Sequence, residues 1–162
     1  MADTVDLLYN CVSLGLWVPF NEGWGQFSAL EVADRLRAMD PTRPIDHASG
    51  WHDQGGGDLK SRHVYYRPVR LKNDGRRVLA LTEFGGYSLQ CPGHLATDKK
   101  FGYRMYDDAA AWMDAVEKLY ETEVLPLIQA QGLSAAVYTQ LSDVEDEVNG
   151  LVTFDLSLIH IS

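Results

Sequence analysis

Apolar and polar residues follow one another in blocks that predict strands and helices in turn. Residues 14–20 form an apolar run without helical period, rich in large and β-branched residues, which is typical of a strand buried on both faces. From 26 to 39 apolar residues recur every three positions among polar ones, which predicts an amphipathic helix, and the proline-containing segment 40–44 ends it. A short strand is expected at 45–48, before a glycine-rich loop at 49–60.

The second half of the chain continues this alternation. The pattern predicts a short strand at 62–66, a buried strand at 76–82, a long helix with one apolar face at 103–131, and a last strand at 133–138. Pro126 is expected to kink or split the helix, because proline lacks the amide hydrogen and its ring displaces a carbonyl of the preceding turn. Gly132 fits a helix C-cap.

Strands that alternate with helices predict an α/β fold, with a parallel sheet and helices outside it. The chain has 162 residues, without an internal repeat or linker, which suits one domain or part of one. A complete (β/α)₈ barrel takes about 250 residues. The five strand candidates therefore predict a partial (β/α)₈ TIM barrel, its second half.

Composition argues against several partners. The formal charge of -9, with no run of Lys or Arg longer than two, offers no attraction to nucleic acid or anionic lipid. No apolar stretch approaches the roughly 20 residues of a membrane-spanning helix. The first residues lack the pattern of a secretion signal, so the sequence predicts no compartment. Cys11 and Cys91 do not form a CxxC motif, which favours two reduced thiols.

Two glutamates stand where a parallel sheet places its ligand site. Glu22 and Glu83 each follow an apolar strand candidate and precede a glycine or Phe-Gly. Cleavage of a glycosidic bond needs such a pair, one carboxylic acid to protonate the departing oxygen and one carboxylate to attack the anomeric carbon. Strand-end glutamates are also commonly helix caps or ion-pair partners, and that alternative stays open on the pattern alone.

Longer motifs carry a family resemblance over roughly residues 10–155. They are Trp17-Val-Pro-Phe-Asn-Glu-Gly-Trp-Gly-Gln-Phe27, Asp46-His-Ala-Ser-Gly-Trp51, Thr82-Glu-Phe-Gly-Gly86 and Val137-Tyr-Thr-Gln-Leu-Ser-Asp-Val-Glu-Asp-Glu-Val-Asn-Gly150. In this order they resemble the catalytic barrel of glycoside hydrolase family 2, the β-galactosidase and β-glucuronidase family. The resemblance implies the C-terminal part of the barrel, roughly its fourth to eighth strands with their helices.

The resemblance also implies roles for particular residues. Glu22 matches the acid/base at the end of the fourth barrel strand, and Asn21 the partner of the sugar 2-hydroxyl. Glu83 matches the nucleophile that ends the seventh strand, and Tyr65 the tyrosine beside it. The function implied is a retaining β-glycoside hydrolase that acts on a terminal β-linked sugar through a covalent glycosyl-enzyme.

Three further side chains are candidates for binding the sugar. Trp51 and Tyr138 offer flat aromatic faces for a pyranose, and His63 lies two residues before Tyr65, on the same face of the expected strand. Each has a structural alternative: packing in the core or at its rim for the two aromatic residues, and a buried structural histidine for His63.

No metal or other cofactor is expected. The group Asp46, His47, His52 and Asp53 has no helical HxxxH spacing and no cysteine, and the acidic segment 143–147 lacks the spacing of an EF-hand.

The expected partner is a carbohydrate substrate. The resemblance further implies an upstream barrel half and β-sandwich domains of the same polypeptide, which would supply contacts to the sugar and its leaving group. Residues 156–162 break from the family pattern and are expected to be a non-native tail, which leaves 1–155 as the barrel segment. Two other functions remain: a catalytically incompetent carbohydrate-binding fragment of such a barrel, and an unrelated α/β protein.

Overall fold

The computed structural model describes residues 1–99 and 101–158, and they form two compact units. The first unit contains Met1–His63, Lys72–Thr82 and Gly132–Ala135. The second contains Val64–Leu71, Glu83–Gln131 and the described residues from Ala136 on. Each unit is described by itself below.

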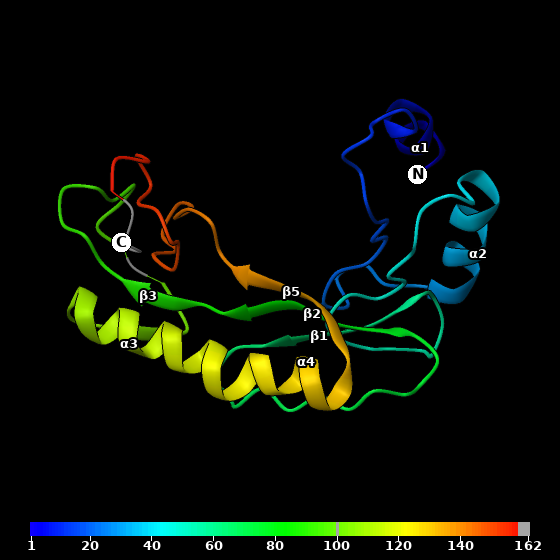
Figure 1. Ribbon diagram of the computed structural model, residues 1–162. Coiled ribbons are helices and arrows are strands. Elements are labelled where there is room, and N and C mark those ends of the chain that lie inside the picture. Colours follow the sequence, from blue (N-terminus) through cyan, green and yellow to red (C-terminus); the bar gives the residue numbers. More distant parts are fainter. Residues whose placement is uncertain (100, 159–162) are drawn as a thin grey trace. The chain divides into compact units, whose positions relative to one another are not determined.

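Among the described residues, two helices come first, four strands follow, and three consecutive helical segments precede the last strand (Figure 1). Their bounds are α1 Ala2–Leu8, α2 Ala29–Met39, β1 Leu59–Val64, β2 Val78–Gly85, β3 Tyr87–Leu89, β4 Arg104–Tyr106, α3 Ala109–Leu119, the π-helix η1 Tyr120–Val124, α4 Leu125–Gln131 and β5 Leu133–Thr139. One sheet has the strand order β1-β2-β5, and β3 pairs in parallel with β4. The expected α/β class with parallel strands is confirmed.

The strands expected at 14–20 and 45–48 are not strands in the structure. The two segments meet only at isolated parallel bridges, Trp17 with Ile45 and Asn21 with Ser49. In a parallel ladder alternate residues donate their amide hydrogens to the partner, so Pro19 would be the next donor after Trp17. Proline has no amide hydrogen, and the ladder is interrupted there.

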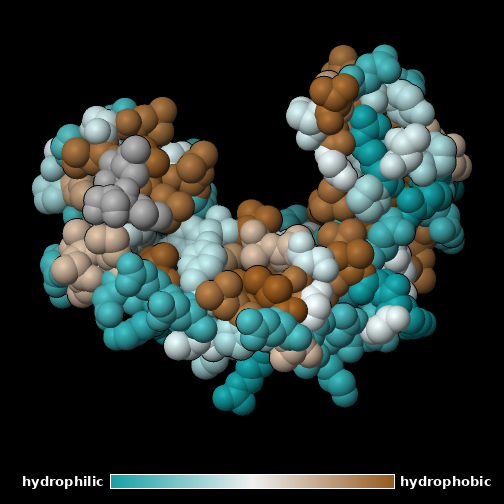
Figure 2. All heavy atoms as spheres, in the orientation of Figure 1, coloured by the Kyte–Doolittle hydropathy of each residue, from teal (hydrophilic) through white to brown (hydrophobic). Residues whose placement is uncertain are grey.

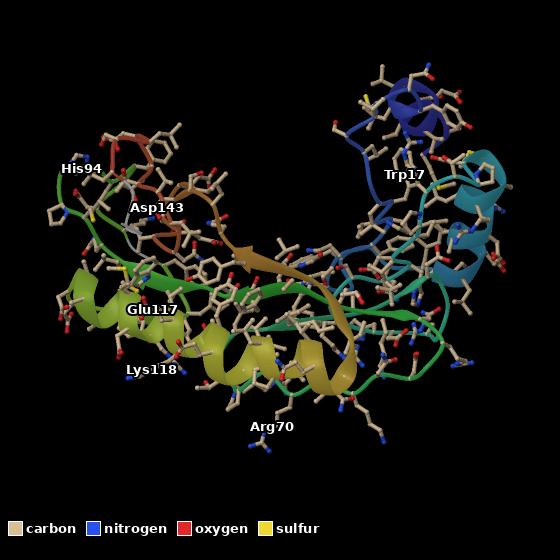
Figure 3. The ribbon with its side chains drawn as sticks, in the orientation of Figure 1. Trp17, Arg70, His94, Glu117, Lys118 and Asp143 are labelled. Carbon is tan, nitrogen blue, oxygen red and sulfur yellow. The ribbon has the colours of Figure 1, made fainter. Side chains whose placement is uncertain are left out.

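The core of the first unit lies between α1, α2 and the segment around Trp17. Its buried members are Val5, Trp17, Ala33, Leu36 and Ile45. The Trp17 indole, labelled in Figure 3, donates a 2.8 Å hydrogen bond to the buried Asp40 carboxylate. The apolar spacing from 26 to 39 therefore predicted α2 correctly, although the helix begins three residues later, at Ala29. Figure 2 shows apolar surface among polar surface on the part of the molecule that carries α1 and α2.

The single helix expected at 103–131 is divided. Its first residues instead form β4, and the helical part runs as α3, η1 and α4, the yellow stretch of Figure 1. The π-turn ends just before Pro126, and there the Leu125 amide bonds five residues back, to the Tyr120 carbonyl. The wider turn is the place where a proline ring can be accommodated without its own amide bond. The expected interruption at Pro126 thus takes the form of a π-helix.

Several boundaries differ from those expected, although the elements exist. β1 begins at Leu59 and ends at Val64, so Tyr65 follows the strand and does not belong to it. β2 runs from Val78 to Gly85 and includes Glu83. Gly132, with φ of +67°, directly follows α4, as expected of a C-cap.

Within the described residues, no helix has the length and hydrophobicity that crossing a membrane requires. Of the expected tail 156–162, residues 159–162 lie outside the described part of the chain. The α1 helix and the short strands β3 and β4 were not expected from the sequence.

Candidate functional site

Glu22 stands on a turn that begins directly after the Asn21–Ser49 bridge. Its amide donates 3.0 Å to the Ser49 carbonyl, and its own backbone has a φ of +53°. A positive φ is uncommon for a residue other than glycine, and such backbone conformations often occur at functional sites. The side chain is 19% exposed, so the carboxyl is partly shielded yet reachable. Asn21 is exposed beside it.

Two hydrogen bonds connect the Glu22 carboxyl to the interior of the first unit. Glu22 Oε1 lies 2.7 Å from His63 Nδ1, and His63 Nε2 lies 3.2 Å from Ser49 Oγ. Ser49 Oγ in turn donates to Thr82 Oγ1 at 3.0 Å. Both ring nitrogens of His63 are thus engaged by side chains, which is the arrangement of the structural alternative for this histidine.

Gly50 makes room for the His63 ring. A Cβ at this position would lie 2.4 Å from His63 Cγ, and Gly50 has a φ of +82°. Glycine is therefore required twice, for the backbone conformation and for the close approach. Ser49 and Gly50 thus position His63 together: Ser49 Oγ forms a hydrogen bond with Nε2, and Gly50 lies against the ring.

Two loops meet beside Glu22. The His52 ring lies against Gly23, where an added Cβ would come within 2.6 Å, and Gln26 Nε2 donates 3.2 Å to the His52 carbonyl. Trp51, the candidate sugar platform, is 44% exposed on one loop, and Trp24 is 79% exposed on the other. Trp51 therefore has an accessible ring face, as a platform requires.

The second unit contains the other glutamate. Glu83 is part of β2, and its Oε2 accepts a short hydrogen bond from the Tyr65 hydroxyl. The same hydroxyl lies 3.2 Å from Thr139 Oγ1, at the end of β5. Tyr65 and Glu83 are therefore partners, as the family resemblance implied.

The environment of Tyr65 keeps its hydroxyl protonated. Burial raises the pKa of Tyr65 far above its ordinary value, and the hydrogen bond to Glu83 raises it further. The Tyr103 ring stacks on Tyr65 with a centroid distance of 3.8 Å and an interplanar angle of 5°. A fixed, neutral phenol is a reliable hydrogen-bond donor to the Glu83 carboxyl group.

Tyr138 is held within the second unit. Its ring meets Phe84 edge to face at 5.6 Å and lies so close to Gly85 that an added Cβ would approach to 2.3 Å. Burial raises the pKa of its hydroxyl well above the ordinary value. These contacts are those of the packing alternative for Tyr138.

In the polar cluster considered for a metal, the Asp53 carboxylate and His47 Nε2 form hydrogen bonds to other residues. The Asp53 carboxylate forms a paired contact with Arg77, at 2.7 and 2.8 Å, and this holds the pKa of Asp53 down to about 2. His47 Nε2 accepts from the Gln54 amide at 3.1 Å. These bonds tie the glycine-rich loop to the start of β2.

The sequence did not single out Ser49, Thr82 or Tyr103. Ser49 and Thr82 belong to two of the quoted motifs, so the signal was present as motif membership. Their hydrogen bonds join residues up to 33 positions apart. Such contacts depend on the register of neighbouring segments, which no local pattern specifies.

Comparison with protein-family models found none that matches this chain, and comparison with curated proteins found no match either.

Proposed function

We propose that the chain is the C-terminal part of a (β/α)₈ glycosidase barrel and acts as a retaining β-glycoside hydrolase, with Glu83 as nucleophile and Glu22 as acid/base. The observation that carries the proposal is the hydrogen bond from Tyr65 to the Glu83 carboxylate. A nucleophile must be ionised, and a buried phenol that donates to it stabilises that charge. The four ordered sequence motifs supply the reaction class.

The backbone supports the barrel part of the proposal. The parallel bridges between segments 17–21 and 45–49 have the pairing of neighbouring barrel strands. The later strands follow chain order in the sheet β1-β2-β5. Strands that pair with their neighbours in chain order are what a (β/α)₈ barrel requires.

The reaction would proceed in two displacements. Glu83 attacks the anomeric carbon while Glu22 gives its proton to the departing oxygen, so that the glycosidic bond breaks and a glycosyl ester forms on Glu83. Water then attacks the anomeric carbon of this ester and gives a proton to Glu22, so the bond from the anomeric carbon to the Glu83 oxygen breaks, the sugar is released and both carboxyl groups are regenerated. Asn21 would hold the sugar 2-hydroxyl, and Trp51 would stack on a sugar ring.

A covalent trap tests the proposal. The 162-residue chain is incubated with 2-deoxy-2-fluoro β-glycosides of galactose, glucose, mannose and glucuronic acid. The mass of the intact protein is then measured, and peptide mapping locates any added mass. A retaining enzyme is expected to gain the mass of one fluorosugar on the peptide that carries Glu83, and the Glu83→Gln variant none. Labelling at another residue, or on the variant, would contradict the assignment.

The same experiment separates the alternative function. A catalytically incompetent carbohydrate-binding fragment would bind the parent sugars, measured by isothermal titration, without gaining mass. An unrelated α/β protein would do neither. In a crystal structure, a retaining enzyme should have its two carboxyl groups about 5–5.5 Å apart, and about 6.5–9.5 Å would indicate inversion.

A further inference from the structure

We propose that Trp24 binds the leaving group of the glycoside, and that this leaving group is a second sugar ring. The inference rests on the proposed function, in which Glu22 protonates the oxygen that departs with this group. Trp24 and Glu22 both belong to the first unit, so their arrangement is described within that unit alone. The substrate class that follows is a β-linked disaccharide or a longer saccharide.

The four tryptophans of the chain are of two kinds. Trp17 and Trp112 are buried, and their indole groups donate hydrogen bonds of 2.8 and 2.9 Å within the core. Trp24 and Trp51 are 79% and 44% exposed. Core packing accounts for the first two, as is usual for a buried indole with a satisfied N–H group, but it does not account for the exposed two.

One contact between two loops brings the exposed tryptophans to the same place. Gly23 lies so close to the His52 ring that an added Cβ would come within 2.6 Å of it. Gln26 Nε2 donates 3.2 Å to the His52 carbonyl, so a hydrogen bond also holds the two loops together. Trp24 directly follows Gly23 on one loop, and Trp51 directly precedes the histidine on the other. Both indoles therefore stand at one junction of loops.

The loop that carries Trp24 is held at both ends. At its start Asn21 forms a parallel bridge with Ser49, and the Trp24 amide donates 3.0 Å to the Asn21 carbonyl. At its end the Phe27 ring meets the buried Phe20 ring edge to face, with centroids 5.5 Å apart. A side chain on a fixed loop loses less conformational entropy when it binds a ligand, which favours binding.

The short distance along the chain from Glu22 assigns Trp24 to the leaving group. A separation of two residues keeps the two Cα atoms within about 7 Å of each other. The Glu22 carboxyl is 19% exposed. The oxygen that it protonates joins the glycone to the leaving group, so the leaving group begins within hydrogen-bonding distance of this carboxyl. A ring attached to that oxygen lies within reach of the Trp24 indole.

A flat indole suits a pyranose ring as its partner. One face of a pyranose carries mainly C–H groups, whose partial positive charge is attracted to the negative face of an aromatic ring. The contact removes apolar surface of both partners from water, and a leaving group of one or two atoms offers almost none of that surface. With Trp51 on one sugar ring and Trp24 on the next, the junction would bind two sugar units on either side of the bond that is cleaved.

Substrates that differ only in the leaving group test the inference. Each glycone of the covalent trap is supplied as its β-1,4-linked disaccharide with glucose and as its β-fluoride, in which the leaving group is a single atom. In Trp24→Ala the ratio of kcat/KM on the disaccharide to kcat/KM on the fluoride should fall on the order of tenfold, because the apolar contact with the second ring is lost.

Two further variants control this comparison. Trp24→Phe keeps a flat ring and should restore most of the ratio. Phe154→Ala removes another exposed aromatic ring, which is 47% exposed in the second unit, and should keep the wild-type ratio. An unchanged ratio in Trp24→Ala would overturn the inference and leave the proposed function intact. If that variant instead changes the mass of the protein measured by light scattering, Trp24 contacts protein and the inference is wrong.

Binding without turnover separates this inference from the proposed function. In Glu22→Gln, whose side chain cannot deliver a proton, the same disaccharides are titrated into ¹⁵N-labelled protein, and the indole N–H signals are assigned from single tryptophan-to-phenylalanine variants. The Trp24 signal is expected to shift, and the dissociation constant to rise on the order of tenfold when Trp24→Ala is added. A Trp24 signal that no disaccharide moves would overturn the inference. If Glu83 gains no fluorosugar while the Trp24 signal shifts, the proposed reaction is wrong and the sugar contact of Trp24 stands.

Discussion

At the scale of single residues, the contact between Tyr65 and Glu83 gives the most direct prediction. Tyr65→Phe keeps the stacking on Tyr103 but removes the hydroxyl that donates to Glu83, the proposed nucleophile. A hydrogen bond to a charged group contributes about 1.5–3 kcal/mol, so kcat on an activated β-glycoside should fall roughly 10- to 100-fold. Tyr66→Phe is the matched control, because Tyr66 is 69% exposed and should retain turnover. Equal losses in both variants would contradict the role of Tyr65.

Gly50 gives a second prediction at this scale. In Gly50→Ala the new Cβ would come within 2.4 Å of the His63 ring, in a backbone conformation with φ of +82°. Gly55 has a φ of +81° and nothing within 4 Å of an added Cβ, so Gly55→Ala carries the backbone strain alone. By urea unfolding, Gly55→Ala should lose on the order of 1 kcal/mol, and Gly50→Ala more.

The larger loss of unfolding free energy in Gly50→Ala should be accompanied by a shift of the nuclear magnetic resonance signals of the His63 ring, because the added methyl group contacts that ring. Gly55→Ala should leave those signals unchanged. If the two alanine variants have equal stability and equal spectra, the close approach of Gly50 to His63 does not constrain the ring.

At the scale of elements, the N-terminus of α3 depends on one side chain. Asp108 has an extended backbone and accepts a 2.8 Å hydrogen bond from the Ala111 amide, which is the geometry of an N-cap. Asp108→Ala should lower the free energy of unfolding by about 1 kcal/mol, measured by urea titration followed by circular dichroism. Asp107→Ala removes the same charge from the preceding residue and should change stability far less.

The elements also show what sequence patterns can and cannot predict. Helical periodicity located α2, and the breaker residue Pro126 located the interruption of the long helix, because both effects are local. The run 14–20 looked like a strand because its composition is right. Pro19 removes a ladder donor in its middle, and that loss is decisive once a partner segment is present.

In the candidate site, too, some features could be predicted from the sequence and others could not. Glu22, Glu83 and Tyr65 were identified through motifs, and the Tyr65–Glu83 contact followed. The hydrogen bonds that connect Glu22 to His63, Ser49 and Thr82 could not be predicted, because each joins residues on different segments and the sequence does not specify how those segments are placed side by side. Hydroxyl residues in quoted motifs are the place to look for such links in other sequences.

At the scale of the whole molecule, acid stability should depend on aspartates that have opposite effects. Arg77 holds the pKa of Asp53 down from 3.8 to about 2, and hydrogen bonds likewise hold the pKa values of Asp40, Asp74 and Asp155 below their ordinary range. A carboxyl with a lower pKa in the folded state stabilises the fold above its unfolded pKa. That contribution is lost as the pH falls from about 3.8 through about 2.

Asp46 works in the other direction. It is fully buried, and burial raises the pKa of its carboxyl, so at neutral pH its charge opposes folding and protonation relieves the penalty as the pH falls. Asp53→Asn should therefore lower the free energy of unfolding at pH 7, by on the order of 1 kcal/mol because solvent screens part of the ion pair, and the deficit should vanish near pH 2. The free energy of unfolding of Asp46→Asn should be most favourable relative to that of the wild type at pH 7, and this difference should disappear as the pH falls. Urea titrations of the three proteins between pH 7 and pH 2 measure both trends, and deficits of the same sign and the same pH dependence in the two variants would contradict the assignment.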